Sequence, residues 1–146
     1  MDSNNHAALL SALQMLKRQD LTILEVSTRL ECKFEPSTVE ETILFLTSNR
    51  LLDDFRYARI AIERNEGRRA VGDQALRDKL ESRGVPLEIV NELMASVDQD
   101  ELTRALVLID AKFSGSKLPG RVARFLSSRG FSDETIESIL EQIEVE

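Results

Sequence analysis

The sequence predicts an all-α protein made of three tandem three-helix repeats, the last one truncated, in an elongated, solenoid-like array. Its composition favours helices, because Leu, Ile, Ala, Glu and Arg abound while the 146 residues include only three Pro and no Trp. Capping residues recur along the chain, and each is followed by apolar residues at helical spacing. One apolar pattern also recurs at intervals of roughly 45 residues, which is typical of a helical repeat protein.

Helices are expected wherever a capping residue precedes an apolar face of helical period. In chain order, the expected helices are 7–18, one beginning at Thr22, 38–49, 54–65, 73–83, 87–96, 99–113, 118–128 and 133–143. Their start signals are Thr22 with Glu25, Ser37 with Glu40, Asp53, Asp98 with Glu101, Pro119 and Ser132.

The recurring apolar pattern divides the chain into a leading helix and three repeats. The segments are residues 1–21, 22–66, 67–114 and 115–146, which are expected to form one continuous array. The equivalent apolar positions are Val26, Leu76 and Val122; Leu30, Leu80 and Leu126; Phe34, Val85 and Phe131; and Val39, Val90 and Ile136. One repeat buries little core by itself, so neighbouring repeats are expected to pack on one another.

The turn that ends the first helix of each repeat is not the same throughout. Repeats 2 and 3 place Gly84 and Gly130 there, each after an arginine, where a glycine in the left-handed conformation can end a helix. Repeat 1 has Cys32 and Lys33 instead, which makes its turn one residue shorter and leaves it without glycine.

Charge is unevenly distributed along this acidic chain, whose formal net charge is −7. Every charged residue in 112–130 is basic, and every charged residue from 131 to 146 is acidic. The simplest explanation for any one of these charges is that the two segments complement each other. The net charge argues against a protein that coats nucleic acid by charge alone.

The residues needed for catalysis or metal binding do not form a recognisable set. His6 is the single histidine and leaves no histidine-based metal site, and Cys32 is the single cysteine and excludes an internal disulfide framework. Adjacent Asp53 and Asp54 are more typical of a helix cap than of acid–base or metal chemistry. No glycine-rich loop of the Walker type is found. We therefore expect no cofactor, no metal and no enzymatic activity.

The apolar runs are far shorter than the ~18 residues of a transmembrane helix. The N-terminus also lacks the basic region and the long apolar run of a signal peptide. We therefore expect a cytoplasmic protein without a membrane segment. Repeat proteins need no symmetry partner, so a monomer is the default expectation.

Four stretches, in this order and spacing, are typical of one known family. They are KRQDLTILEV at 17–26, LLDDFRYA at 51–58, GDQALRDKLESRGV at 72–85 and RFLSSRGF at 124–131. On these residues the chain resembles the RecX family of bacterial regulatory proteins over nearly its whole length.

This resemblance implies a regulatory protein that binds the RecA recombinase, or its filament on single-stranded DNA. Binding would inhibit the recombinase, ATPase and coprotease activities and so modulate DNA repair and the SOS response. The acidic net charge of this chain predicts weak or no direct DNA binding. The partner-binding residues would be exposed cations near the repeat turns: Arg68, Arg69, Arg77, Lys79, Arg83, Arg121, Arg124 and Arg129. The residues that match the family pattern but are interpreted as structural are Leu52, Asp53, Asp54, Tyr57, Gly84, Gly130 and Phe131.

Two other functions remain open at this point. A three-helix unit resembles a helix-turn-helix in outline, so the chain could be a helical nucleic-acid-binding module. It could also be a diverged adaptor with another protein partner. For any single cation, a solvated helix face that pairs with nearby carboxylates is an alternative to a contact site.

Overall fold

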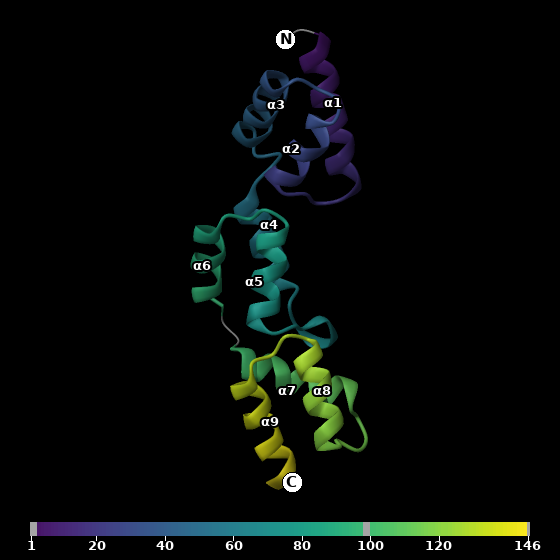
Figure 1. Cartoon of the computed structure of the whole chain (residues 1–146), viewed down its shortest axis with the longest axis vertical. Helices are drawn as coiled ribbons and strands as arrows, with labels where there is room; N and C mark the ends of the chain where they lie inside the picture. Colours follow the sequence, from purple (N-terminus) through teal and green to yellow (C-terminus); the bar gives the residue numbers. More distant parts are fainter. Residues whose placement is uncertain (1–2, 98–99, 146) are drawn as a thin grey trace. The chain divides into compact units, whose positions relative to one another are not determined.

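The computed structural model describes residues 3–97 and 100–145, and for residues 144 and 145 it describes the backbone alone. Over these residues the chain is helical and contains no strand (Figure 1), which confirms the all-α prediction. The helices are α1 (Ser3–Arg18), α2 (Ile23–Glu31), α3 (Pro36–Ser48), α4 (Asp54–Glu63), the 3-10 helix η1 (Gly67–Arg69), α5 (Asp73–Ser82), α6 (Leu87–Ala95), α7 (Glu101–Lys112), α8 (Pro119–Ser128) and α9 (Asp133–Val145).

Internal packing divides the chain into two compact units. Unit 1 comprises Met1–Arg59 with Leu80–Val90, and unit 2 comprises Ile60–Lys79 with Asn91–Glu146. Helices α4, α5 and α6 each contribute residues to both units. The division into three repeats stays a prediction.

The core of unit 1 lies between α1, α2 and α3, which pack pairwise on one another (Figure 1). Its buried residues are Ala12, Leu21, Val26, Leu30, Val39, Leu46 and Leu52. The small side chains Ala8 and Ala12 are fully buried, which lets α1 approach its neighbours closely. The leading helix is therefore an integral part of this core.

The core of unit 2 lies between η1, α7, α8 and α9. Its buried residues are Ala70, Ala105, Leu108, Ile109, Val122, Leu126, Phe131, Ile136 and Ile139. Burial of apolar surface at these positions is the main source of stability for a unit of this kind.

Several helices begin where their capping residues predict. Thr22 and Glu25 form the complete capping box of α2. The Asp53 side chain accepts a hydrogen bond from the Arg56 N–H at 3.1 Å, and the Ser132 hydroxyl accepts one from the Thr135 N–H at 3.2 Å.

Two predicted helix starts need correction. The expected box of Ser37 with Glu40 does not form, because α3 begins at Pro36 with Glu35 at its N-cap. Proline suits this first position, since its φ is already helical and its missing N–H would have no partner there. Asp98, the expected cap of α7, lies outside the described residues. Helix α7 instead begins at Glu101, with the Asp100 carboxylate accepting from the Thr103 N–H at 2.8 Å.

The two predicted glycine turns are confirmed. Gly84 has φ +94° and Gly130 has φ +79°, which is the left-handed region that glycine enters without strain. The residue after each glycine, Val85 or Phe131, is buried. In the turn without glycine, which is one residue shorter, the equivalent residue Phe34 is only half-buried.

The same junction between helix ends occurs once in each unit. In unit 1 the Thr22 hydroxyl donates to the carbonyl of Arg83, and in unit 2 the Gly72 N–H donates to the carbonyl of Arg129 at 2.8 Å. Thr22 and Gly72 each precede the first residue of a helix, α2 or α5, and the two arginines each precede a left-handed glycine. The same local geometry therefore occurs at two places in the chain.

A carboxylate completes each junction by accepting the first N–H of the same helix. In unit 1 the Asp54 carboxylate accepts from the Ile23 N–H at 2.9 Å. In unit 2 the Glu101 carboxylate accepts from the Asp73 N–H, also at 2.9 Å. Asp54 and Glu101 are the first residues of α4 and α7, so equivalent helices supply the two acids. Asp54 therefore has a structural contact beyond the cap that the sequence indicated.

Candidate functional site

The predicted partner-binding cations differ in how far their side chains are exposed to solvent. All of them except Arg83 belong to unit 2. The side chains that are exposed are those of Arg68, Arg69, Lys79, Arg121 and Arg124. Those of Arg77, Arg83 and Arg129 are half-buried, so the expectation that all these cations are exposed needs correction.

Internal contacts account for the half-buried cations. The Arg83 guanidinium pairs with the Glu25 carboxylate at 3.0 Å, and the Glu25 side chain is only 18% exposed. Arg77 donates to the side-chain oxygen of Asn91 at 2.7 Å. Arg129 donates to the carbonyls of Arg68 and Ala70 at 3.2 and 3.1 Å. In each of these contacts the arginine uses at least one N–H donor, which is then not available to a bound partner protein.

Two aromatic rings in unit 2 gather three cations around them. Phe113 and Phe125 pack edge to face, with ring centroids 5.6 Å apart. The Lys112 amine lies 5.7 Å and the Arg129 guanidinium 5.1 Å from the centroid of Phe125, and the Arg121 guanidinium lies 5.9 Å from that of Phe113. We call these five residues the basic–aromatic cluster. At such distances each ring face attracts the cation over it.

The local structure explains why these residues meet. Lys112 ends α7 and Phe113 is its C-cap, while Arg121 and Phe125 are four residues apart on α8 and so share one face. Arg129 caps the C-terminus of α8, and its bonds to η1 bring the backbone of Arg68 beside the cluster. Arg124 lies one turn along α8 from Arg121.

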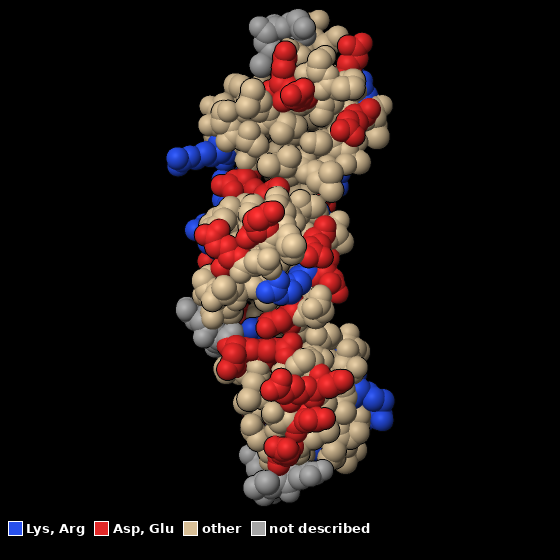
Figure 2. All heavy atoms as spheres, turned by 60° about the vertical axis from the view of Figure 1, so that its left-hand side comes forward, with Lys and Arg blue, Asp and Glu red and all other residues tan. Residues whose placement is uncertain are grey.

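Positive charge at the cluster is not neutralised by nearby acids. None of Lys112, Arg121, Arg124 and Arg129 has an ion pair within the part of the chain that the structure describes. A group of acidic side chains lies instead along α9, which includes Asp133, Glu134, Glu137 and Glu141; Figure 2 shows acidic side chains gathered at the C-terminal end of the chain. Guanidinium groups can bind carboxylates or phosphates through two parallel hydrogen bonds. The cluster is therefore a candidate contact surface for an acidic partner.

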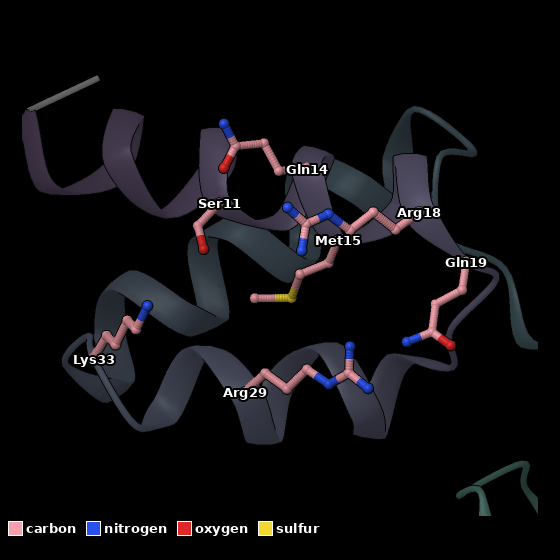
Figure 3. Close-up of a pocket in the computed structure, with 7 residues that line it drawn as sticks. All are labelled: Ser11, Gln14, Met15, Arg18, Gln19, Arg29 and Lys33. Carbon is pink, nitrogen blue, oxygen red and sulfur yellow. The ribbon is translucent and has the colours of Figure 1, made fainter.

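A second basic feature, which the sequence did not indicate, is a groove in unit 1 between α1 and α2 (Figure 3). It encloses about 280 Å³ and is lined by Ser11, Gln14, Met15, Arg18, Gln19, Arg29 and Lys33. From sequence, Arg18 and Arg29 are merely last-turn cations that complement the negative end of a helix. Only the packing of α1 beside α2 shows that they and Lys33 line one hollow.

No group of three or more His, Cys, Asp or Glu side chains suited to a metal occurs among residues 3–97 and 100–143. No helix in the described segments is long and apolar enough to cross a bilayer.

Comparison with known proteins gives one consistent result, although no family model matches the chain. The chain is 30% identical over 132 residues to the regulatory protein RecX of Vibrio parahaemolyticus, covering 86% of this chain and 84% of that protein. It is 29% identical over 145 residues to the regulatory protein RecX of Trichlorobacter lovleyi, covering 91% and 93%. The crystal structure of RecX from Lactobacillus salivarius matches with a TM-score of 0.80 at 18% identity, covering 100% of both chains.

Proposed function

The chain belongs to the RecX family of regulatory proteins, and we propose that it binds the RecA recombinase or its filament on single-stranded DNA. Binding inhibits the recombinase, ATPase and coprotease activities of RecA, and thereby modulates DNA repair and the SOS response. The observation that carries this proposal is the sequence match to RecX regulatory proteins over 86% of the chain. The protein acts in the cytoplasm, where RecA and its filament are found, and it acts by contact rather than by catalysis.

The basic–aromatic cluster, with the neighbouring Arg68 and Arg124, supports a contact with an acidic surface of the recombinase. None of its cations forms an ion pair within the described residues, so binding a carboxylate there breaks no internal ion pair, although Arg129 also donates to the carbonyls of Arg68 and Ala70. The two rings hold the cations in place, which reduces the side-chain entropy lost on binding. Arg69 and Lys79 are further exposed cations of unit 2. Because Arg77 and Arg83 are engaged internally, they contribute less.

A titration of RecA activity tests the proposal. Single-stranded-DNA-dependent ATP hydrolysis by RecA is measured with increasing amounts of the parent chain and of the variant Arg68→Glu/Arg121→Glu/Arg124→Glu. The parent is expected to inhibit. In the variant, the concentration for half-inhibition is expected to rise at least tenfold, because each lost charge contact is worth about 0.5–1 kcal/mol.

The control variant Lys17→Glu/Arg59→Glu/Arg64→Glu makes the same change in net charge at exposed side chains outside the cluster. It is expected to inhibit like the parent. If the parent leaves ATP hydrolysis unchanged at molar excess over RecA, the proposed function is wrong. If all three proteins inhibit equally, the inhibition stands and the contact lies elsewhere. A parallel titration of DNA without RecA at low salt tests the nucleic-acid-binding alternative.

A further inference from the structure

We propose that the groove between α1 and α2 is a binding site for a phosphate group, which Arg18, Arg29 and Lys33 would contact. This site is separate from the basic–aromatic cluster, and it is argued from the geometry of unit 1 alone. We call it the α1–α2 groove.

The lining of the groove is suited to an anion. All its lining residues belong to unit 1, in which α1 and α2 pack directly on each other. Figure 3 shows Met15 pointing from α1 into the space between the helices, with Arg18 on the α1 side and Arg29 and Lys33 on the α2 side. Met15 packs against the core below and gives the groove an apolar floor. Such a floor strengthens the attraction between the cations and a bound anion, because it keeps water away from one side.

The cations of the groove have no counter-charge of their own. No acid lines the groove, and none of the three cations forms an ion pair within residues 3–97 and 100–143. Most cations of this chain likewise have no ion pair among the described residues, so the distinguishing feature of the groove is that three cations and no carboxylate line the same hollow. The position at a helix C-terminus explains Arg18 and Arg29 singly. It does not explain why three positive charges line one hollow without a carboxylate among them.

Neutral polar side chains also line the groove. The Gln19 amide lies beside Arg29, and with its oxygen and nitrogen exchanged the oxygen would accept from both terminal guanidinium nitrogens at 3.3 Å and orient the guanidinium. Ser11 and Gln14 add a hydroxyl and an amide on the α1 side of the groove. An anion in this space would meet donors from both helices.

Size and charge favour phosphate over a carboxylate. A carboxylate carries one negative charge on two oxygens, whereas a phosphate or diphosphate carries two or more charges on more oxygens and can engage all three cations. The volume of about 280 Å³ accommodates such a group but falls just below the ~300–1,000 Å³ of pockets that enclose a whole organic ligand. A nucleoside attached to the phosphate would therefore lie outside the groove.

The phosphate can come from two sources, a small phosphate compound or the backbone of single-stranded nucleic acid. One phosphate contact contributes little to DNA affinity, which agrees with the weak or absent DNA binding expected from the acidic chain. Calorimetric titration with sodium pyrophosphate and fluorescence anisotropy with a labelled single-stranded oligonucleotide, both at low salt, distinguish the sources. Both use the full chain without RecA, so their outcome is independent of the proposed inhibition.

The matched variants are Arg29→Gln/Lys33→Gln, which removes two groove charges, and Arg59→Gln/Arg64→Gln, which removes two exposed charges elsewhere. Far-ultraviolet circular dichroism checks that both retain the parent helix content. The parent is expected to bind pyrophosphate, the oligonucleotide or both. The Arg59→Gln/Arg64→Gln variant is expected to bind the same probe with the same affinity as the parent. The groove variant is expected to bind at least tenfold more weakly.

Binding of pyrophosphate alone would identify a small phosphate compound as the source, and binding of the oligonucleotide alone would identify nucleic acid. The proposal is overturned if neither probe binds the parent, or if the groove variant binds as the parent does. It is also overturned if a glutamate-rich peptide binds the groove more tightly than pyrophosphate, because the site would then be one for carboxylates.

Discussion

Replacing Gly72 by alanine is expected to lower the free energy of unfolding by about 3 kcal/mol, because the new methyl group would overlap the backbone of unit 2. A Cβ at this position would lie 2.0 Å from the carbonyl oxygen of Gly130, 2.3 Å from its carbonyl carbon and 2.5 Å from the Phe131 nitrogen. All three are backbone atoms, so no side-chain rotation relieves the overlap. The C-terminal turn of α8 would have to move away from α5, which breaks the bond from the Gly72 N–H to the Arg129 carbonyl.

Urea denaturation followed by circular dichroism at 222 nm measures this effect. The matched control is Gly115→Ala, because a Cβ at Gly115 would meet nothing within 4 Å. The control is expected to change the free energy of unfolding by less than about 0.5 kcal/mol. Equal stability of the two variants would show that the close approach of α5 to the α8 turn does not contribute as inferred.

Replacing Glu101 by alanine is expected to lower the free energy of unfolding by roughly 2–3 kcal/mol, because several donors lose their acceptor together. One carboxylate oxygen accepts from the Asp73 N–H at 2.9 Å. The other accepts from the hydroxyls of Thr135 and Ser132, the latter at 2.8 Å, and from the Ser132 N–H at 3.4 Å. The side chain thus joins the first turns of α5 and α9 to α7.

The contribution of Glu101 is also expected to depend on pH. Burial by itself raises the pKa of this carboxyl, but the hydrogen bonds from Thr135, Asp73 and Ser132 together lower it below its ordinary value of 4.5. A lowered pKa in the folded state means that the stabilisation is complete above pH 4.5 and is lost as the pH falls further. The stability difference between the parent and Glu101→Gln is therefore expected to shrink from pH 7 to below pH 4.5.

The matched control is Glu137→Gln, an exposed acid on α9. Its denaturation profile is expected to follow that of the parent at each pH, within about 0.5 kcal/mol. A stability difference for Glu101→Gln that stays constant from neutral to acid pH would contradict the assignment of ionised Glu101 as the acceptor.

Asp54 occupies the equivalent place in unit 1 but has the opposite shift. Burial dominates there and raises the pKa of Asp54, while the single hydrogen bond from the Ile23 N–H lowers it only in part and the Asp53 and Glu25 carboxylates raise it further. The pKa shifts of these two acids thus have opposite directions, because Glu101 accepts several hydrogen bonds whereas Asp54 accepts one.

The sequence by itself determined the all-α class, most helix starts and the two glycine turns. These features depend on signals that act within a few residues. Thr22, Asp53 and Ser132 cap the helices that follow them, and Gly84 and Gly130 end helices in the left-handed conformation. The prediction was wrong where two local signals competed, as at α3, where Pro36 rather than the capping box sets the first residue.

Only the tertiary structure decided which charged side chains form internal ion pairs and which line the α1–α2 groove. Arg83 pairs with Glu25 across 58 positions, and Arg104, which periodicity does not mark as buried, lies 4% exposed in an ion pair with Asp73 across 31 positions. Arg18 likewise lines one groove with Arg29 and Lys33 only through the packing of α1 on α2. Such contacts depend on how distant helices pack, and a capping residue or an apolar period specifies only the helix in which it occurs.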